Sequence, residues 1–440
     1  MYIFYSVLVL AVFILASPWF VYQALRYRKY VGSLGQRMGY LPVSFNMDGD
    51  ESIWIHAVSV GEVLTARPLI ADLRKRYPQL KVFLSTTTIA GQQLARRSVP
   101  NVDEVFYFPF DLGIFVRRTL DLVRPRMFLM METEIWPVVL RECRRRGVRT
   151  AVVNGRLSTR SFSRYRMIRP FMRRVLLDVD RFCVQSDESA RRFIDLGADP
   201  ARVMITGSLK FDSLDPPGQV RARDRVLRYF RVAASRPIIV AGSTMKGEEA
   251  AVLRAFRRVR AAWPSALLIV APRHPERFTE VEQLCRGEGW KTARRSELAI
   301  DADPRADIVV LDTIGELATL YQLGTVVFVG GSLVPTGGHN VLEPAIFGKP
   351  IVFGPHMDNF REIADTFLAS GAAVRLDDEG QLEEAFLGLL GDPVRRARLG
   401  AAARALVEAN RGAKDKTMTV LEGLVQPAAP SNVIPFRPIA

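Results

Sequence analysis

From residue 53 onward, short apolar runs alternate with longer amphipathic stretches, and this alternation constrains the fold more than any other feature of the chain. Strands that alternate with helices in this way pair in parallel as βαβ units. The runs that predict strands span residues 53–57, 82–85, 105–108, 127–131, 150–153 and 181–184, then 237–241, 266–271, 308–311, 326–329 and 350–353. The helical pattern is clearest at 63–77 and 135–146. We therefore predict an α/β protein with two Rossmann-like, doubly wound domains.

The run Asp215-Pro216-Pro217-Gly218 interrupts this pattern and predicts a linker. The last residues contain four prolines and are expected to be disordered. The predicted divisions are an N-terminal domain at 26–213, a linker at 214–220, a C-terminal domain at 221–425 and a disordered tail at 426–440. Ligands of such sheets bind beyond the carboxyl ends of the strands, so we expect the two domains to face a cleft.

The N-terminus has a different composition. Residues 2–24 contain no charged side chain, and their number fits one transmembrane helix of about 20 residues. Arg26, Arg28 and Lys29 follow at once, which by the positive-inside rule leaves the rest of the chain in the cytoplasm. A cleaved signal peptide fits less well, because no basic residue precedes the apolar run. We predict an uncleaved transmembrane anchor at residues 1–25.

The charge balance indicates an anionic partner. The 440 residues carry a formal net charge of +15, which suits a nucleic acid, an anionic membrane or an acidic substrate. Three scattered cysteines, Cys143, Cys183 and Cys285, predict no disulfide framework and no metal cluster. Three Asp-x-Asp triplets, at 48–50, 178–180 and 301–303, lie away from the other motifs. We interpret them as turns or surface carboxylates and predict no metal.

The most informative single motif is the glycine-rich stretch 330–345. An apolar strand leads into a loop with four glycines, and a helix is expected to open near Asn340. Glycine lets backbone N–H groups approach a ligand closely, and a helix N-terminus favours negative charge. Glu343 does not suit an anion, but its carboxylate can accept hydrogen bonds from a ribose diol. The stretch therefore favours a nucleotide-sugar site over a dinucleotide fingerprint or a P-loop, although a simple glycine-rich turn remains an alternative.

Further motifs follow the predicted strands in a specific order. They are Ser-Val-Gly-Glu at 59–62, Glu-Thr-Glu-Ile-Trp-Pro at 132–137, Leu-Lys-Phe-Asp at 209–212, Pro-Arg-His-Pro-Glu-Arg at 272–277 and Gly-Gly-His-Asn-Val-Leu-Glu-Pro at 337–344. In this order and spacing they resemble the 3-deoxy-D-manno-octulosonic acid (Kdo) transferases, from the N-terminus to about residue 360. The resemblance implies a GT-B fold, with the acceptor bound by the first domain and the nucleotide by the second. It also implies transfer of Kdo from CMP-Kdo to the lipid A precursor at the inner membrane.

The resemblance assigns the catalytic residues to the first domain. Glu62 is expected to be the general base of an inverting transfer, although a glutamate in the first turn of a helix is also an ordinary choice there. Glu132 and Lys210 match the pair that stabilises the transition state in this family. An interdomain salt bridge is the plainer interpretation of Glu132 and Lys210. Glu134 is a close rival of Glu132.

The second domain is expected to bind CMP. Arg273 follows a strand and can direct two donors onto a phosphate. The residues that the resemblance assigns to the nucleotide are Pro272, Arg273, Ile314, Gly315, Glu316, Asn340, Val341, Leu342 and Glu343. No cofactor is expected.

Two alternatives belong to other classes. A GT-B glycosyltransferase or epimerase acting on a UDP-sugar would handle a nucleotide similarly, but it would not carry the motifs at 132–137 and 209–212. A nucleic-acid binder would need basic and aromatic side chains interleaved along a groove. The basic clusters at 144–146 and 164–174 belong to no such motif, and a phosphorylated lipid at an anionic membrane accounts for the charge. We therefore expect a membrane partner and no nucleic acid.

Overall fold

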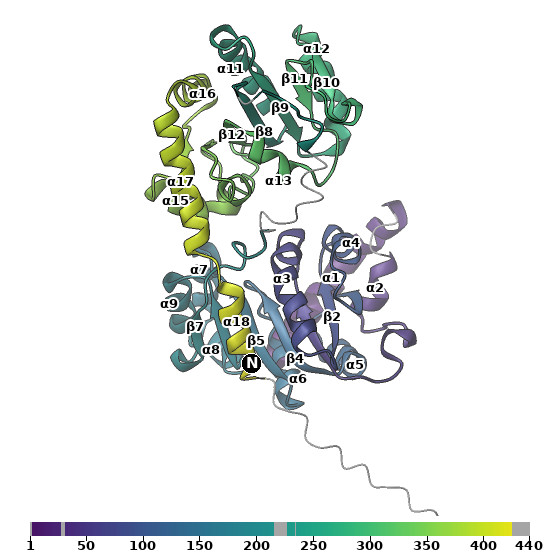
Figure 1. Ribbon diagram of the computed structural model, residues 1–440. Coiled ribbons are helices and arrows are strands. Elements are labelled where there is room, and N and C mark those ends of the chain that lie inside the picture. Colours follow the sequence, from purple (N-terminus) through teal and green to yellow (C-terminus); the bar gives the residue numbers. More distant parts are fainter. Residues whose placement is uncertain (1, 28–30, 215–226, 234, 425–440) are drawn as a thin grey trace, which may run out of the picture. The chain divides into compact units, whose positions relative to one another are not determined.

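The computed structural model describes residues 2–27, 31–214, 227–233 and 235–424, which form two compact units (Figure 1). The first unit comprises Met1–Ser213 together with Arg411–Ala440, and the second comprises Leu214–Asn410. Each unit is built on one parallel sheet with helices between its strands. The predicted α/β class with two Rossmann-like domains is therefore confirmed.

The first sheet has seven strands in the order β3-β2-β1-β4-β5-β6-β7. All of its pairings are parallel. The strands are β1 (Ser52–His56), β2 (Lys81–Thr86), β3 (Glu104–Tyr107), β4 (Pro125–Met131), β5 (Arg149–Gly155), β6 (Arg181–Val184) and β7 (Val203–Ile205). The order reverses beside β1, so the carboxyl ends of β1 and its neighbours form the switch point at which such sheets bind ligands.

The second sheet also has seven strands, in the order β10-β11-β9-β8-β12-β13-β14. Its pairings are likewise parallel. The strands are β8 (Ile238–Thr244), β9 (Leu267–Pro272), β10 (Thr292–Arg294), β11 (Ile308–Val310), β12 (Val326–Val329), β13 (Ile351–Phe353) and β14 (Val374–Arg375). The edge strands β7, β10 and β14 were not predicted from the sequence.

Helices occupy the connections. In the first unit they are α1 (Tyr2–Tyr27), α2 (Val31–Arg37), α3 (Val60–Arg76), α4 (Ile89–Ser98), α5 (Gly113–Val123), α6 (Pro137–Arg145), α7 (Thr159–Met167), α8 (Arg169–Leu176), α9 (Asp187–Leu196) and α18 (Ala413–Glu422). In the second unit they are α11 (Glu248–Ala262), α12 (Phe278–Gly287), α13 (Leu317–Leu320), α14 (Leu342–Ala345), α15 (Arg361–Ala369), α16 (Leu382–Gly391) and α17 (Pro393–Ala409).

The first sheet is buried on both faces, as parallel sheets are when helices cover each side. Along β1 the side chains alternate between the faces: Trp54 belongs to one core cluster, and Ile53 and Ile55 belong to the other. All three are fully buried. The sequence therefore supplies continuous apolar runs at the strands, and polar residues are left for the strand ends.

The last described helix, α18, belongs to the first unit although it follows the second in sequence (Figure 1). Its apolar side chains join a core cluster of the first sheet that also contains Leu209. The Asp212 carboxylate accepts hydrogen bonds of 2.8 Å from the backbone N–H groups of Gly412 and Lys414, and Lys414 pairs with Asp72 at 2.6 Å. The sequence-based boundary that gave residues 411–424 to the second domain is therefore wrong. Residues 215–220 of the predicted linker and the predicted tail at 426–440 lie outside the described residues.

The N-terminal helix α1 contacts the rest of the first unit through the hydroxyl groups of two tyrosines. The hydroxyl of Tyr2 donates to Asp178 at 2.7 Å, and that of Tyr5 donates to Asp111 at 2.9 Å. Within the described residues no helix combines the length and the apolar character needed to cross a membrane. The transmembrane anchor predicted at residues 1–25 is therefore not supported.

Candidate active site

Glu62 lies in the first turn of α3, directly after β1, and its carboxylate is held by two donors. Oε2 accepts a hydrogen bond of 2.9 Å from the backbone N–H of Val58, and Oε1 accepts one of 3.2 Å from the hydroxyl of Ser59. Ser59 precedes the helix, but its side chain makes no cap of its own. The carboxylate therefore turns back over the helix start and stays at the carboxyl end of β1.

Burial dominates the electrostatics of this carboxyl. It raises the pKa of Glu62 above the ordinary glutamate value, against the lowering effect of the Val58 N–H. The nearby carboxylates of Glu132 and Glu134 raise this pKa further. A raised pKa is what a general base needs, because an ordinary glutamate accepts protons too weakly near neutral pH.

Glu132 and Lys210 form an ion pair within the first unit, not between the two domains. Lys210 Nζ lies 3.9 Å from Glu132 Oε1, and each side chain is 20% exposed. Glu132 follows β4 with a left-handed backbone, φ 54°, and its N–H donates to the carbonyl of Val153 at 2.9 Å. A non-glycine residue in this region is strained, and such strain gathers at functional sites.

Glu134, the rival of Glu132, faces a buried histidine. Its Oε2 lies 4.0 Å from Nε2 of His56. The His56 imidazole is fully buried and stacks on Phe108, with ring centroids 3.8 Å apart. Burial lowers the pKa of His56 to about 3, so the ring is neutral. Burial also raises the pKa of Glu134.

Asn154 is a site residue that sequence reasoning did not assign. It lies near the end of β5 with φ 56° and is fully buried. Its Oδ1 accepts a hydrogen bond of 2.9 Å from the backbone N–H of Leu209, next to Lys210. Asn154 therefore fixes the loop that carries the lysine. An asparagine before glycine after a predicted strand was the available signal, because asparagine tolerates the left-handed region.

Two of the predicted nucleotide residues, Arg273 and Glu343, are close enough to interact electrostatically. This exposed arginine follows β9, and its backbone N–H donates to the carbonyl of Thr244 at 2.9 Å. Its charge lowers the pKa of Glu343, where burial has the larger, raising effect. Burial, with Arg273 as a second cause, also lowers the pKa of His339 to about 4. Asn340 Nδ2 donates to Oε1 of Glu343 at 3.1 Å. These contacts bring an arginine, an amide and a buried carboxyl together.

The remaining predicted residues divide by exposure. Pro272, Val341 and Leu342 are buried, and only their backbone groups could meet a ligand. Ile314 is 82% exposed, beside Gly315 with φ 89°. Glu316 is engaged by Arg295, with its Oε2 2.9 Å from the guanidinium Nε. The loop at 314–316 thus offers an apolar side chain and backbone groups, while its carboxylate is already paired.

The glycine-rich loop differs from the expectation that its N–H groups serve a ligand. Three consecutive N–H groups donate to the carboxylate of Glu248, from Gly331 at 2.6 Å, Ser332 at 2.9 Å and Leu333 at 2.8 Å. The N–H of Met245 donates to it as well, at 2.8 Å. Glu248 is 1% exposed. An internal carboxylate therefore occupies the anion cradle that the glycines form.

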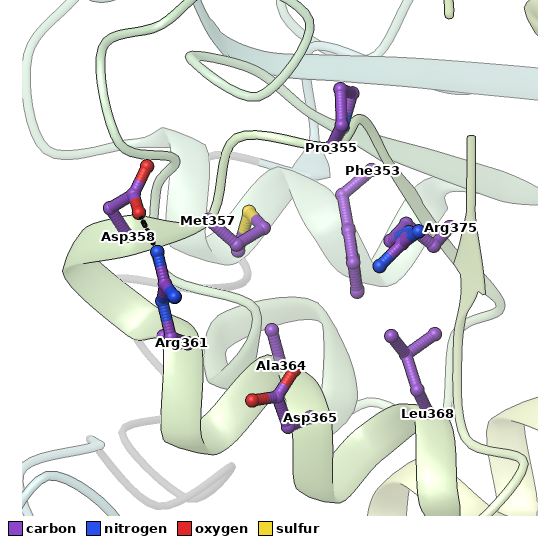
Figure 2. A pocket seen from close by; sticks show the side chains of 9 residues that line it. All are labelled: Phe353, Pro355, Met357, Asp358, Arg361, Ala364, Asp365, Leu368 and Arg375. Atoms are coloured by element: carbon purple, nitrogen blue, oxygen red, sulfur yellow. Dashed lines mark hydrogen bonds and ion pairs between the residues drawn. The ribbon is translucent and has the colours of Figure 1, made fainter. Parts of the chain in front are cut away.

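A pocket of about 210 Å³ lies in the second unit (Figure 2). Its lining comprises Phe353, Pro355, Met357, Asp358, Arg361, Ala364, Asp365, Leu368 and Arg375. In Figure 2 the Arg361 guanidinium is paired with the Asp358 carboxylate, and Arg375 pairs with Asp377 at 3.3 Å. None of the residues predicted to bind the nucleotide lines it.

The Asp-x-Asp triplets take part in ordinary surface pairing. Asp301 contacts Arg228, and Asp303 pairs with Arg236 at 2.6 Å. Asp180 accepts a hydrogen bond from the N–H of Thr150 at 2.8 Å. Among the residues that the structure describes, no group of three or more His, Cys, Asp or Glu side chains is arranged to hold a metal ion.

Comparison with known proteins identifies relatives that match most of the chain. Residues 32–213 match the family described as 3-deoxy-D-manno-octulosonic-acid transferase (kdotransferase). The 3-deoxy-D-manno-octulosonic acid transferase of Haemophilus influenzae is 32% identical over 90% of this chain and 92% of its own length. The enzyme of the same name from Bordetella pertussis is 36% identical over 84% of this chain and 86% of its own.

Solved structures agree on the fold. A UDP-GlcNAc 2-epimerase from Neisseria meningitidis aligns with a TM-score of 0.58 over 85% of this chain and all of its own, at 12% identity. At that identity the likeness concerns the fold alone, which is of the GT-B type. The two relatives match most of the chain, so the chain is a glycosyltransferase and belongs to the 3-deoxy-D-manno-octulosonic acid transferase family.

Proposed function

We propose that the protein is an inverting transferase that moves Kdo from CMP-Kdo to a phosphorylated lipid A precursor, with Glu62 as the general base. The observation that carries the proposal is the environment of Glu62. This carboxyl is fixed by Val58 and Ser59 at the carboxyl end of β1, and burial raises its pKa. A base with these properties can remove a proton from a sugar hydroxyl at the moment of attack.

The proposed reaction is a single displacement at the anomeric carbon of Kdo. The acceptor hydroxyl oxygen forms a bond to the anomeric carbon of Kdo, and the bond from that carbon to the CMP phosphate oxygen breaks. Glu62 takes the hydroxyl proton, and CMP leaves with the electron pair. Lys210, held 3.9 Å from Glu132, supplies a positive charge for the anionic donor.

Different residues of the second unit are proposed to bind the different parts of CMP. We assign the CMP phosphate to Arg273 and the ribose hydroxyls to Glu343, which Asn340 orients at 3.1 Å. Backbone groups of the loop at 314–316 are assigned to the cytosine edge. Because the Glu316 carboxylate is paired with Arg295, its proposed part is to hold this loop rather than to touch the base.

The acceptor and the membrane are assigned to the surface of α7, α8 and α1. The exposed basic side chains there are Arg160, Arg164, Arg166, Arg169, Arg173 and Arg174. Between the two basic helices, Met167 is 79% and Ile168 is 47% exposed. Phe171 of α8 packs on Tyr2 and Tyr5 of α1, with ring centroids 5.7 and 5.6 Å apart.

The outer side of α1 adds apolar surface to this region. Its exposed apolar side chains are Ile3, Phe4, Val7, Leu8, Leu10, Val12, Ile14 and Leu15. A helix that lies on its own protein and turns apolar residues outward is suited to the plane of a membrane interface. We propose association with the cytoplasmic face of the inner membrane through this surface.

Mass spectrometry of reaction products tests the proposal. The full chain is incubated with CMP-Kdo and a tetraacyl lipid A precursor in anionic vesicles, and a mass increase of one or more Kdo units is expected. UDP-GlcNAc in place of CMP-Kdo should give no product. The variant Glu62→Gln keeps the shape of the side chain and should lower turnover by about 10² or more, while CMP binding measured by calorimetry stays unchanged. Near-normal turnover of folded Glu62→Gln would remove Glu62 from the role of base.

A further inference from the structure

His56 has one ring nitrogen that the proposed mechanism leaves unexplained. Its Nδ1 lies 3.2 Å from the carbonyl oxygen of Ser85 and 3.0 Å from Ser85 Oγ. Its Nε2 is buried without a hydrogen-bond partner and faces Oε2 of Glu134 at 4.0 Å. Orphaned buried polar atoms are rare and costly, so an atom of this kind at the end of β1 indicates a role.

The surroundings of Ser85 determine which nitrogen carries the proton. Ser85 Oγ accepts a hydrogen bond of 2.8 Å from the indole of Trp54, and its own hydroxyl donates to the carbonyl of Ile55 at 3.4 Å. A lone pair on Nδ1 would oppose the Ser85 carbonyl, whereas an Nδ1–H donates to it. The proton therefore belongs on Nδ1, and the lone pair on Nε2 points at Glu134. Because burial lowers the pKa of the ring to about 3, Nε2 does not take up a second proton.

We propose that Glu134 is held as a neutral carboxylic acid that donates a hydrogen bond to Nε2 of His56, which leaves Glu62 as the carboxylate that ionises. The inference rests on the proposed role of Glu62 as base, and it makes His56 and Glu134 positioning residues. The partners of the two carboxyls differ. Glu62 accepts hydrogen bonds from an N–H and a hydroxyl, which favour the ionised form. Glu134 faces the lone pair on Nε2 of His56, which favours the acid and opposes the indole of Trp136, which lowers the pKa of Glu134. At 4.0 Å the pair needs only a small rotation of Glu134, of the kind by which catalytic contacts tighten when substrate binds.

The charges around the pair give this arrangement a purpose. Burial raises the pKa of Glu62 to about 8 and that of Glu134 to about 7, and the charge of Glu132 raises both further. Because both carboxyls titrate near neutral pH, their hydrogen-bond partners decide which of them keeps the proton. Tyr165 also interacts with Glu134: burial raises the pKa of Tyr165, and a charge on Glu134 would raise it further. Arg37 acts on the ring of His56, lowering its pKa. If Glu134 is neutral, Glu62 ionises beside one carboxylate that Lys210 already accompanies at 3.9 Å, rather than beside two.

The tautomer of His56 can be read directly by nitrogen NMR. The chain has only four histidines, so long-range proton–nitrogen spectra of the ¹⁵N-histidine-labelled full chain are sparse, and His56→Gln assigns the signal. We expect a neutral ring protonated on Nδ1 across the neutral pH range. A ring protonated on Nε2, or a charged ring, overturns the proposal, because either would donate to an ionised Glu134.

Infrared difference spectra report the proton on Glu134 itself. Subtracting the spectrum of Glu134→Gln from that of the wild type should show the carbonyl band of a protonated carboxylic acid at neutral pH. The same subtraction with Glu104→Gln, an exposed carboxyl of β3, should show only an ionised carboxylate. In His56→Phe, which keeps an aromatic ring on Phe108, the acid band should move to the frequency of a weaker hydrogen bond. An ionised Glu134 in the wild type, or an unmoved band in that variant, refutes the pairing.

Kinetics then separates positioning from general-base catalysis. Glu134→Gln keeps a neutral donor, so the pH profile of kcat/KM should keep its position, whereas Glu62→Gln should lower kcat/KM by about 10². A loss in Glu134→Gln as large as that in Glu62→Gln, or a profile displaced to lower pH, contradicts a neutral Glu134. The spectra need no turnover, so they decide this inference even if the transfer reaction proposed above fails its own test.

Discussion

The carboxylate of Glu248 should be the main support of the glycine-rich loop, and Glu248→Gln measures this. Its Oε1 accepts from Ser332 and Leu333, while its Oε2 accepts from Met245 and Gly331. A glutamine retains one oxygen and places an NH₂ group against two of these four N–H donors. Each buried N–H left without an acceptor costs about 1–3 kcal/mol, so the second unit should lose roughly 2–4 kcal/mol after partial relaxation.

Hydrogen exchange by mass spectrometry, with chemical denaturation alongside, suits this test because the effect is local. Peptides covering residues 329–345 should exchange faster in Glu248→Gln, and the affinity for CMP should fall with the loss of loop order. Glu280→Gln is the matched control, since the Glu280 side chain is 54% exposed and pairs with the Arg277 guanidinium at 3.2 Å. If the free energy of unfolding of Glu248→Gln lies within about 0.5 kcal/mol of the wild-type value and hydrogen exchange in the loop is unchanged, Glu248 does not support the loop.

Three further outcomes are expected from the geometry. Arg273→Ala and Glu343→Ala should each raise the dissociation constant for CMP about tenfold, because a charge-assisted hydrogen bond contributes roughly 1.5–3 kcal/mol; unchanged calorimetric affinity in both would move the nucleotide elsewhere. The value of kcat/KM should rise with pH only above 4.5, the ordinary pKa of glutamate, because burial keeps Glu62 protonated at that pH and activity needs its ionised form. If kcat/KM instead rises around the ordinary pKa, the base is exposed to solvent. Replacing Arg164, Arg166 and Arg173 by Glu should release the protein from anionic liposomes, while the affinity for CMP stays unchanged. Each of these charges contributes about 1 kcal/mol to membrane binding and is screened by salt. Liposome binding equal to that of the wild type would place the interaction on another surface.

Hydrophobic patterning predicted the interior strands because burial on both faces leaves a continuous apolar run. It missed β7, β10 and β14, which lie at sheet edges and are short. The residues of β10, Thr292–Arg294, are only partly buried and carry no apolar run. Nothing local separates such a strand from a loop, because its state is fixed by pairing with a neighbour rather than by its own composition.

Site residues that belong to a sequence motif could be proposed from the sequence. Residues whose role depends on contacts with distant parts of the chain could not. Glu62, Glu132 and Lys210 stand in recognisable motifs, and the structure holds the last two 3.9 Å apart. Glu248 looks in sequence like an ordinary acidic residue in a first helical turn. Three of its four partners lie more than 80 residues away. Asn154 is similar, because its hydrogen bond to Leu209 spans 55 residues.

The return of α18 to the first unit has a consequence for synthesis on the ribosome. When residue 213 has left the exit tunnel, all seven strands of the first sheet exist, yet one side of its core still lacks Ala413, Met418 and Leu421. The Asp212 carboxylate likewise waits for the N–H groups of Gly412 and Lys414. The first unit therefore reaches its final packing only after the whole second unit has been translated, and a nascent chain stalled before residue 411 leaves apolar surface open to chaperones.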